Sequence, residues 1–169
     1  AYEDSPLPIE EEQTISQPYI VALMIAAVRP KPGDRVLEIG TGSGYAAAVL
    51  SRVVARVYTV ERHEALAVQA RRRLRELGYD NVEVLHGDGS LGWADHAPYD
   101  AIIVTAGGPR VPRQLRDQLA VGGRLIVPVG ADVRLQRLVR VTRIDLNRFE
   151  EKQLGEVRFV PLVGEDAWA

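Results

Sequence analysis

A glycine-rich loop is the first stretch of this chain with the residue types for chemistry. Gly40-Thr41-Gly42-Ser43-Gly44 directly follows the short apolar run at 35–40. Glycines allow a sharp backbone turn and let a ligand approach the backbone closely. The helix that we expect to begin near Gly44 adds free N–H groups and a positive dipole end. Since a plain structural turn would read the same way, the loop needs support from other residues.

Two acidic residues supply that support, because each follows a predicted strand. Glu61 ends the strand after the glycine loop, at the distance of roughly 20 residues where an acid binds the two ribose hydroxyls. Gly87-Asp88-Gly89 ends the following strand, where the Asp88 carboxylate can accept a hydrogen bond from the amine of an adenine. Gly-Asp-Gly is also an ordinary turn sequence. Taken in order on successive strands, the three features predict an adenosine site that also includes Arg62.

Two kinds of cofactor contain adenosine and use a glycine loop. Gly42, Gly44 and Ala47 match the Gly-x-Gly-x-x-Gly/Ala form of dinucleotide sites. Glu38, two residues before Gly40, argues against a pyrophosphate and suits a cationic amino-acid ligand. The spacing of Glu38 and the three glycines is similar to that of class I S-adenosylmethionine methyltransferases. Dinucleotide binding stays the weaker alternative, and stabilisation by NAD would revive it.

The elements that position these residues alternate along the chain. The pattern predicts an α/β fold with a Rossmann-like, doubly wound, mostly parallel sheet and a C-terminal antiparallel strand pair. Helices are expected at 17–28, 44–54, 63–77 and 111–120, and strands at 35–40, 56–61, 81–89, 99–109, 122–130, 134–144 and 152–162.

The length of 169 residues predicts one domain. We divide it into a substrate-side helix segment at 1–30, a cofactor-binding core at 31–130, and closing strands with a substrate wall at 131–169. The net charge of −2 gives no reason to expect nucleic acid or an anionic membrane as a partner. The longest apolar run, 19–28, is far too short to span a bilayer.

The cysteine and histidine content excludes several further classes of site. With no cysteine, the chain has no disulfide, thiolate metal ligand or cysteine nucleophile. The three histidines are scattered, so we expect no metal. We expect an excised domain of a cytoplasmic protein.

The chain as a whole resembles the protein-L-isoaspartate O-methyltransferase family. The resemblance covers nearly the whole chain, and its most particular motifs are Thr-Ile-Ser-x-Pro and the late Val-Arg-Phe-Val-Pro-Leu. Its segments are QTISQP at 13–18, VLEIGTGSGY at 36–45, VYTVER at 57–62, GDG at 87–89, PYDAIIVTAGGP at 98–109, VGGRLIVPVG at 121–130 and VRFVPLVG at 157–164.

The resemblance implies an activity, a cofactor and a partner. The methyl group of S-adenosylmethionine would pass to the free α-carboxylate of L-isoaspartyl residues in damaged proteins or peptides, leaving S-adenosylhomocysteine. The ester would then close to a succinimide without enzyme help. An α-carboxyl has a pKa of roughly 3.3–3.7, so at neutral pH it is an anion and needs no general base. Oligomeric state stays open.

The resemblance also implies roles for residues outside the glycine loop. It places the hydroxyl of Ser16 at the acceptor carboxylate, although Ser16 before Pro18 is also an ordinary helix cap. Both interpretations can hold together. Other residues implied at the substrate are Thr14, Gln17, Ala106, Val160, Pro161 and Leu162, and those implied at the cofactor besides the loop are Ile15 and Ser16.

The sequence departs from the family before the first predicted helix. Glu10 and Glu12 stand where the family commonly has glycine, and they bring negative charge near a site for a carboxylate. Family members also have several tens of residues before the point where this sequence begins. Two alternatives therefore stay open: a domain that binds S-adenosylmethionine without methylating isoaspartate, and a methyltransferase for another carboxyl or hydroxyl acceptor.

Overall fold

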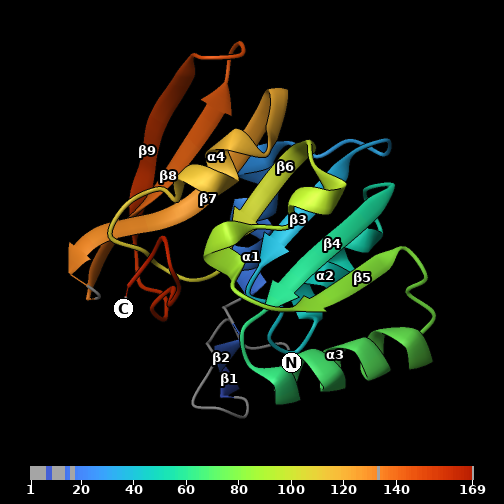
Figure 1. Cartoon of the computed structure of the whole chain (residues 1–169). Helices are drawn as coiled ribbons and strands as arrows, with labels where there is room; N and C mark the ends of the chain where they lie inside the picture. The colour runs from blue at the N-terminus through green and yellow to red at the C-terminus, as the bar shows by residue number, and fades with distance from the viewer. Residues whose placement is uncertain (1–6, 9–13, 16–17, 133, 169) are drawn as a thin grey trace.

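The computed structural model describes residues 7–8, 14–15, 18–132 and 134–168 (Figure 1). Its elements in chain order are β1 (Leu7–Pro8), β2 (Thr14–Ile15), α1 (Pro18–Val28), β3 (Arg35–Ile39), α2 (Tyr45–Ser51), β4 (Arg56–Glu61), α3 (Glu64–Glu76), β5 (Val82–His86), the 3₁₀ turns η1 (Gly89–Leu91) and η2 (Ala94–His96), β6 (Tyr99–Val104), α4 (Arg113–Asp117), β7 (Leu119–Asp132), β8 (Leu135–Arg143) and β9 (Phe149–Val157).

Seven strands form the main sheet in the order β5-β4-β3-β6-β7-β8-β9. The pairs from β5 to β7 are parallel, whereas β7–β8 and β8–β9 are antiparallel. The strand order reverses at β3, which has β4 on one side and β6 on the other. In a doubly wound sheet the ligand lies beyond the carboxyl ends of the strands at such a reversal. The predicted fold class is therefore confirmed, together with its antiparallel C-terminal pair.

Apolar side chains cover both faces of the central strands, as a buried parallel sheet requires. α1 and α2 lie behind the sheet in the view of Figure 1, and α4 lies in front of it. Residues that pack on the α1 and α2 face include Met24, Val36, Leu50, Ile103 and Ile126, whereas those on the α4 face include Leu37, Ile102, Leu115 and Leu125. Helices on both faces leave the carboxyl edge of the sheet as the place for a site.

The second closing strand differs from the prediction of 152–162, which was wrong at both ends. β9 begins at Phe149, and its register with β8 ends where Gln136 pairs with Val157. Beyond that point the chain leaves the ladder, because Phe159 bonds to the side chain of Gln136 and Pro161 has no N–H to donate. The apolar residues at 159–162 suggested a strand from sequence, but they leave the β8–β9 ladder and bond to Gly107 instead.

Other boundaries moved by a few residues. The helix expected at 111–120 covers only Arg113–Asp117, because Leu119 already pairs with Tyr99 in the sheet. The helix expected at 44–54 ends at Ser51. The strand expected at 122–130 is longer at both ends, because β7 runs from Leu119 to Asp132.

Before α1, two short segments pair outside the main sheet. Leu7 and Pro8 pair antiparallel with Ile15 and Thr14, which the sequence did not predict. Among the helices in the described part of the chain, none is both long and apolar enough to cross a membrane.

Candidate active site

The glycine loop after β3 has a backbone that only glycine adopts readily. Gly40, Gly42 and Gly44 all have positive φ, at 97°, 53° and 85°. At Gly40 there is also no room for a side chain, because a Cβ would lie 2.4 Å from Oγ1 of Thr105. The Thr105 hydroxyl donates to the carbonyl oxygens of Ile39 and Gly40, each at 3.0 Å. The tip of β6 therefore supports the loop from one side.

Glu61 supports the loop from the other side. Its Oε2 accepts from the Gly42 N–H at 2.8 Å and its Oε1 from the His63 N–H at 2.9 Å. The side chain is only 5% exposed. A carboxylate has about four acceptor positions, so two remain for the hydroxyls of a ligand. The structure thus brings the predicted ribose acid into contact with the predicted loop.

Glu38 lies beneath the loop, in a chain of buried side chains. The Thr59 hydroxyl donates to Oε2 of Glu38 at 2.6 Å, and the Thr41 and Thr59 hydroxyl oxygens are 2.6 Å apart. Oε1 of Glu38 is buried and has no hydrogen-bond partner among the described residues. A buried oxygen of this kind fits a ligand that carries a cationic donor, such as the ammonium group of an amino acid.

The pKa of Glu38 is raised, and this changes the charge that a ligand would meet at the loop. Burial raises this pKa to about 8; the Thr59 hydrogen bond lowers it and the nearby Glu61 raises it further. Burial therefore favours the neutral form of this side chain. A neutral Glu38 repels a pyrophosphate less than the sequence suggested. A cation beside Glu38 would favour its charged form.

Asp88 already accepts three hydrogen bonds from the protein. Its Oδ1 accepts from the N–H and the hydroxyl of Ser90, at 2.9 and 2.8 Å, and its Oδ2 accepts from the Glu165 N–H at 2.8 Å. Burial acts to raise the pKa of Asp88, but these bonds and the charge of Arg62 outweigh it, and the net pKa is lowered. Asp88 is therefore an ionised acceptor with about one position left for a ligand.

Among the described residues, Gly89, Arg62 and the segment at 160–162 lie near the ends of β3, β4 and β6. Gly89 packs on the end of β3, where a Cβ would lie 2.4 Å from Cγ2 of Ile39. Exposed Arg62 donates from Nη1 to the Val163 carbonyl at 3.1 Å. Ala106 and Leu162 are buried, Val160 is half-buried and Pro161 is exposed.

Several predicted residues cannot be placed. Ser16 and Gln17, and also Glu10 and Glu12, lie outside the described residues. Thr14 and Ile15 form β2, and only their backbone pairing is described.

Sequence reasoning missed three polar residues that hold the site together, namely Thr59, Thr105 and Gln136. Thr59 gives the clearest signal, because it is the one small polar residue inside the otherwise apolar centre of a strand.

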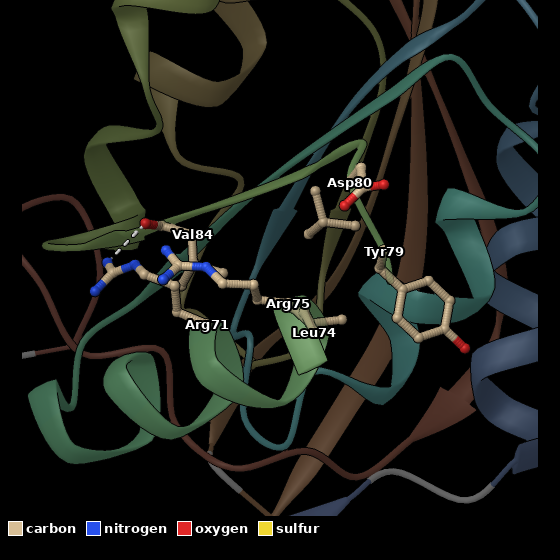
Figure 2. Close-up of a pocket in the computed structure, with 7 residues that line it drawn as sticks. Arg71, Leu74, Arg75, Tyr79, Asp80 and Val84 are labelled. Carbon is tan, nitrogen blue, oxygen red and sulfur yellow. Dashed lines mark hydrogen bonds between the residues drawn. The ribbon is translucent and has the colours of Figure 1, made fainter. Parts of the chain in front are cut away.

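A separate pocket lies away from this edge, between the end of α3 and the start of β5 (Figure 2). It is lined by Arg71, Leu74, Arg75, Tyr79, Asp80, Val82 and Val84. The Arg71 guanidinium donates from Nη2 to the Val84 carbonyl at 2.8 Å. None of the predicted site residues lines this pocket.

Known proteins resemble the chain over its whole length. The model of the family described as protein-L-isoaspartate(D-aspartate) O-methyltransferase matches residues 1–167. The chain belongs to this family. Protein-L-isoaspartate O-methyltransferase 2 of Pelobacter propionicus is 64% identical over 168 residues, which cover 99% of this chain and 75% of that protein. Protein-L-isoaspartate O-methyltransferase 1 of Rhodopseudomonas palustris (strain HaA2) is 59% identical over 169 residues, covering 100% of this chain and 69% of that protein.

Solved structures agree with the family assignment. A protein-L-isoaspartate O-methyltransferase structure superposes with a TM-score of 0.89 at 38% identity and covers 98% of this chain. This chain spans about half of that one, 54%. A Plasmodium falciparum beta-aspartate methyltransferase in complex with S-adenosyl-L-homocysteine superposes with a TM-score of 0.79 at 27% identity, covering 96% of this chain and 81% of that one. The resemblance seen in the sequence is confirmed.

The raised pKa of Glu38 predicts a specific dependence of stability on pH. A carboxyl whose folded pKa exceeds its unfolded value of 4.5 contributes stability that is complete below 4.5 and is lost as the pH rises through about 8. At ~1.4 kcal/mol per pKa unit, the loss amounts to a few kcal/mol. Glu38→Gln should flatten the fall in unfolding free energy between pH 5 and pH 9, measured by denaturant unfolding. Equal slopes in the two proteins would show that Glu38 is not protonated in the fold.

Proposed function

We propose that this chain transfers the methyl group of S-adenosylmethionine to the free α-carboxylate of L-isoaspartyl residues in damaged proteins or peptides. The observation that carries the proposal is the order of groups at one sheet edge: the glycine loop after β3, Glu61 after β4 and Asp88 after β5, next to a wall at 160–162. Family membership supports the acceptor. The expected cytoplasmic location stays a prediction.

The loop and the acids would hold the cofactor. Gly40, Thr41, Gly42 and Gly44 would cradle its amino-acid part, with the unpartnered oxygen of Glu38 nearby to meet an ammonium group. The remaining residues that we assign to the cofactor are Glu61 at the ribose, Asp88 and Gly89 at the adenine, and Arg62, Ile15 and Ser16 beside them. S-adenosylmethionine supplies the electrophilic methyl group when it is bound.

The acceptor side has to position an anion rather than to move a proton. An α-carboxylate is ionised at neutral pH, and its attack on a sulfonium removes charge as the bond forms. A site that excludes water and aligns the two groups therefore supplies most of the rate. We assign the acceptor contacts to the Ser16 hydroxyl, to Thr14, Gln17 and Ala106, and to the wall formed by Val160, Pro161 and Leu162.

The activity can be tested with two peptides that differ only in isoaspartate or aspartate at one position. We expect label from S-adenosylmethionine to appear as a base-labile ester on the isoaspartyl peptide alone. S-adenosylhomocysteine binding without turnover on either peptide would favour a domain that binds the cofactor only. The negative charge of Glu10 and Glu12 would then be the first feature to test by substitution. Turnover on a small acid but on no peptide would favour another acceptor.

The adenine contact of Asp88 can be tested by calorimetry. Asp88→Ala should weaken S-adenosylhomocysteine binding by about 1–3 kcal/mol, because an acceptor for the adenine amine is lost. Ser90→Ala is the matched control, since it removes one of the bonds that Asp88 accepts but keeps the carboxylate. Unchanged affinity in Asp88→Ala, or an equal loss in both variants, would remove Asp88 from the adenine site.

The role of Ser16 can be separated from helix capping by measuring two quantities. Ser16→Ala should slow methyl transfer about tenfold or more through loss of a donor to a charged acceptor, worth roughly 1.5–3 kcal/mol. The affinity for S-adenosylhomocysteine should stay within about twofold, because the cofactor contact that we assign to Ser16 is one of its main chain, which the substitution keeps. If transfer and cofactor affinity fall together, Ser16 acts as a helix cap alone.

A further inference from the structure

The side chain of Gln136 connects two segments that are distant in sequence. Gln136 lies near the start of β8 and is 1% exposed. Its Oε1 accepts from the Phe159 N–H at 2.8 Å, and its Nε2 donates to the Phe159 carbonyl at 3.1 Å. The side-chain amide thus bonds to both main-chain groups of Phe159, as a residue of a neighbouring strand would, two residues beyond the last backbone pair of β8 and β9.

Gly107, at the tip of β6, lies directly against this amide. A Cβ on Gly107 would be 2.3 Å from Nε2 of Gln136, so only glycine permits the contact. The Gly107 N–H donates to the Val160 carbonyl and the Leu162 N–H donates to the Gly107 carbonyl, both at 2.8 Å. The segment 159–162 is therefore held by Gln136 at its start and by Gly107 along its length.

No regular ladder sets the path of this segment among the described residues. Its only strand-like pairing is the single bridge between Gly107 and Pro161. Because the pairing is so short, the direction in which the segment leaves β9 depends on how Phe159 is fixed. The glycine loop, by contrast, is fixed by Glu61 and Thr105.

We propose that Gln136 is a positioning residue for the acceptor: its carboxamide fixes Phe159 and thereby sets the place of residues 160–162 against the tip of β6. The inference rests on the proposed function, because residues 160–162 meet a peptide only if the chain methylates isoaspartyl peptides. Loss of the carboxamide should weaken capture of the isoaspartyl peptide while the cofactor still binds.

Gln118 offers a matched control with the same chemistry elsewhere. It is 7% exposed, its Oε1 accepts from the Trp93 N–H at 3.0 Å, and its Nε2 donates to the Leu91 carbonyl at 2.9 Å. It too packs against a glycine, Gly92. Replacing either glutamine by Met removes a buried carboxamide that brackets a loop, but only Gln136 contacts the wall segment.

The test measures KM for the isoaspartyl peptide and kcat at saturating S-adenosylmethionine, together with the Kd for S-adenosylhomocysteine and the unfolding temperature. Both Gln136→Met and Gln118→Met should lower the unfolding temperature. Only Gln136→Met should raise the peptide KM, by about tenfold, as expected for the loss of a pair of buried hydrogen bonds. Its Kd for S-adenosylhomocysteine should stay within about twofold of the native value.

Three outcomes separate the claims. An unchanged peptide KM in Gln136→Met, or an equal rise in both variants, overturns the positioning role. If Gln136→Met does not fold, Gln136→Asn replaces it, because this side chain keeps an uncharged carboxamide but withdraws it from Phe159 by one methylene; an unchanged KM there also overturns the role. A native chain that methylates no isoaspartyl peptide overturns the proposed function itself.

Discussion

The parallel register of β3, β4 and β6 is the constraint on which the rest of the structure depends. Ile39 pairs with Val60 on one side and with Val104 on the other, so the three strands end level with one another. Because both faces of these strands are buried, a shift of one residue would turn apolar side chains into the wrong layer. The glycine loop, Glu61 and Thr105 meet only because this register holds.

Beyond the strand ends, single side chains satisfy backbone groups that no ladder can reach. Buried backbone donors and acceptors need partners, and regular pairing stops at the carboxyl edge. Here the partners are single side chains: Glu61 for Gly42 and His63, Thr105 for Gly40, Asp88 for Ser90 and Glu165, and Gln136 for Phe159. The irregular backbone at this edge is thus satisfied without a regular ladder.

The sequence predicted those parts of the fold and the site that depend on local patterns. Alternating apolar runs and helices indicated the parallel sheet, and the spacing from Gly40 to Glu61 indicated that loop and acid would meet. The path of 159–162 could not be predicted, because its partners are a side chain and a strand tip about 23 and 52 residues away. The raised pKa of Glu38 likewise depends on burial, which its position in an apolar strand suggests but does not quantify.

The contact between Arg71 and the Val84 carbonyl affects how the open edge of the sheet can meet other chains. β5 is the last strand on its side of the sheet, and an open strand edge can recruit an extended segment of another chain. The Arg71 guanidinium occupies the Val84 carbonyl, which an added strand would use as an acceptor. It also places a positive charge beside the other edge groups of β5. The sheet edge at β5 is thereby a poorer template for pairing with a strand of another chain.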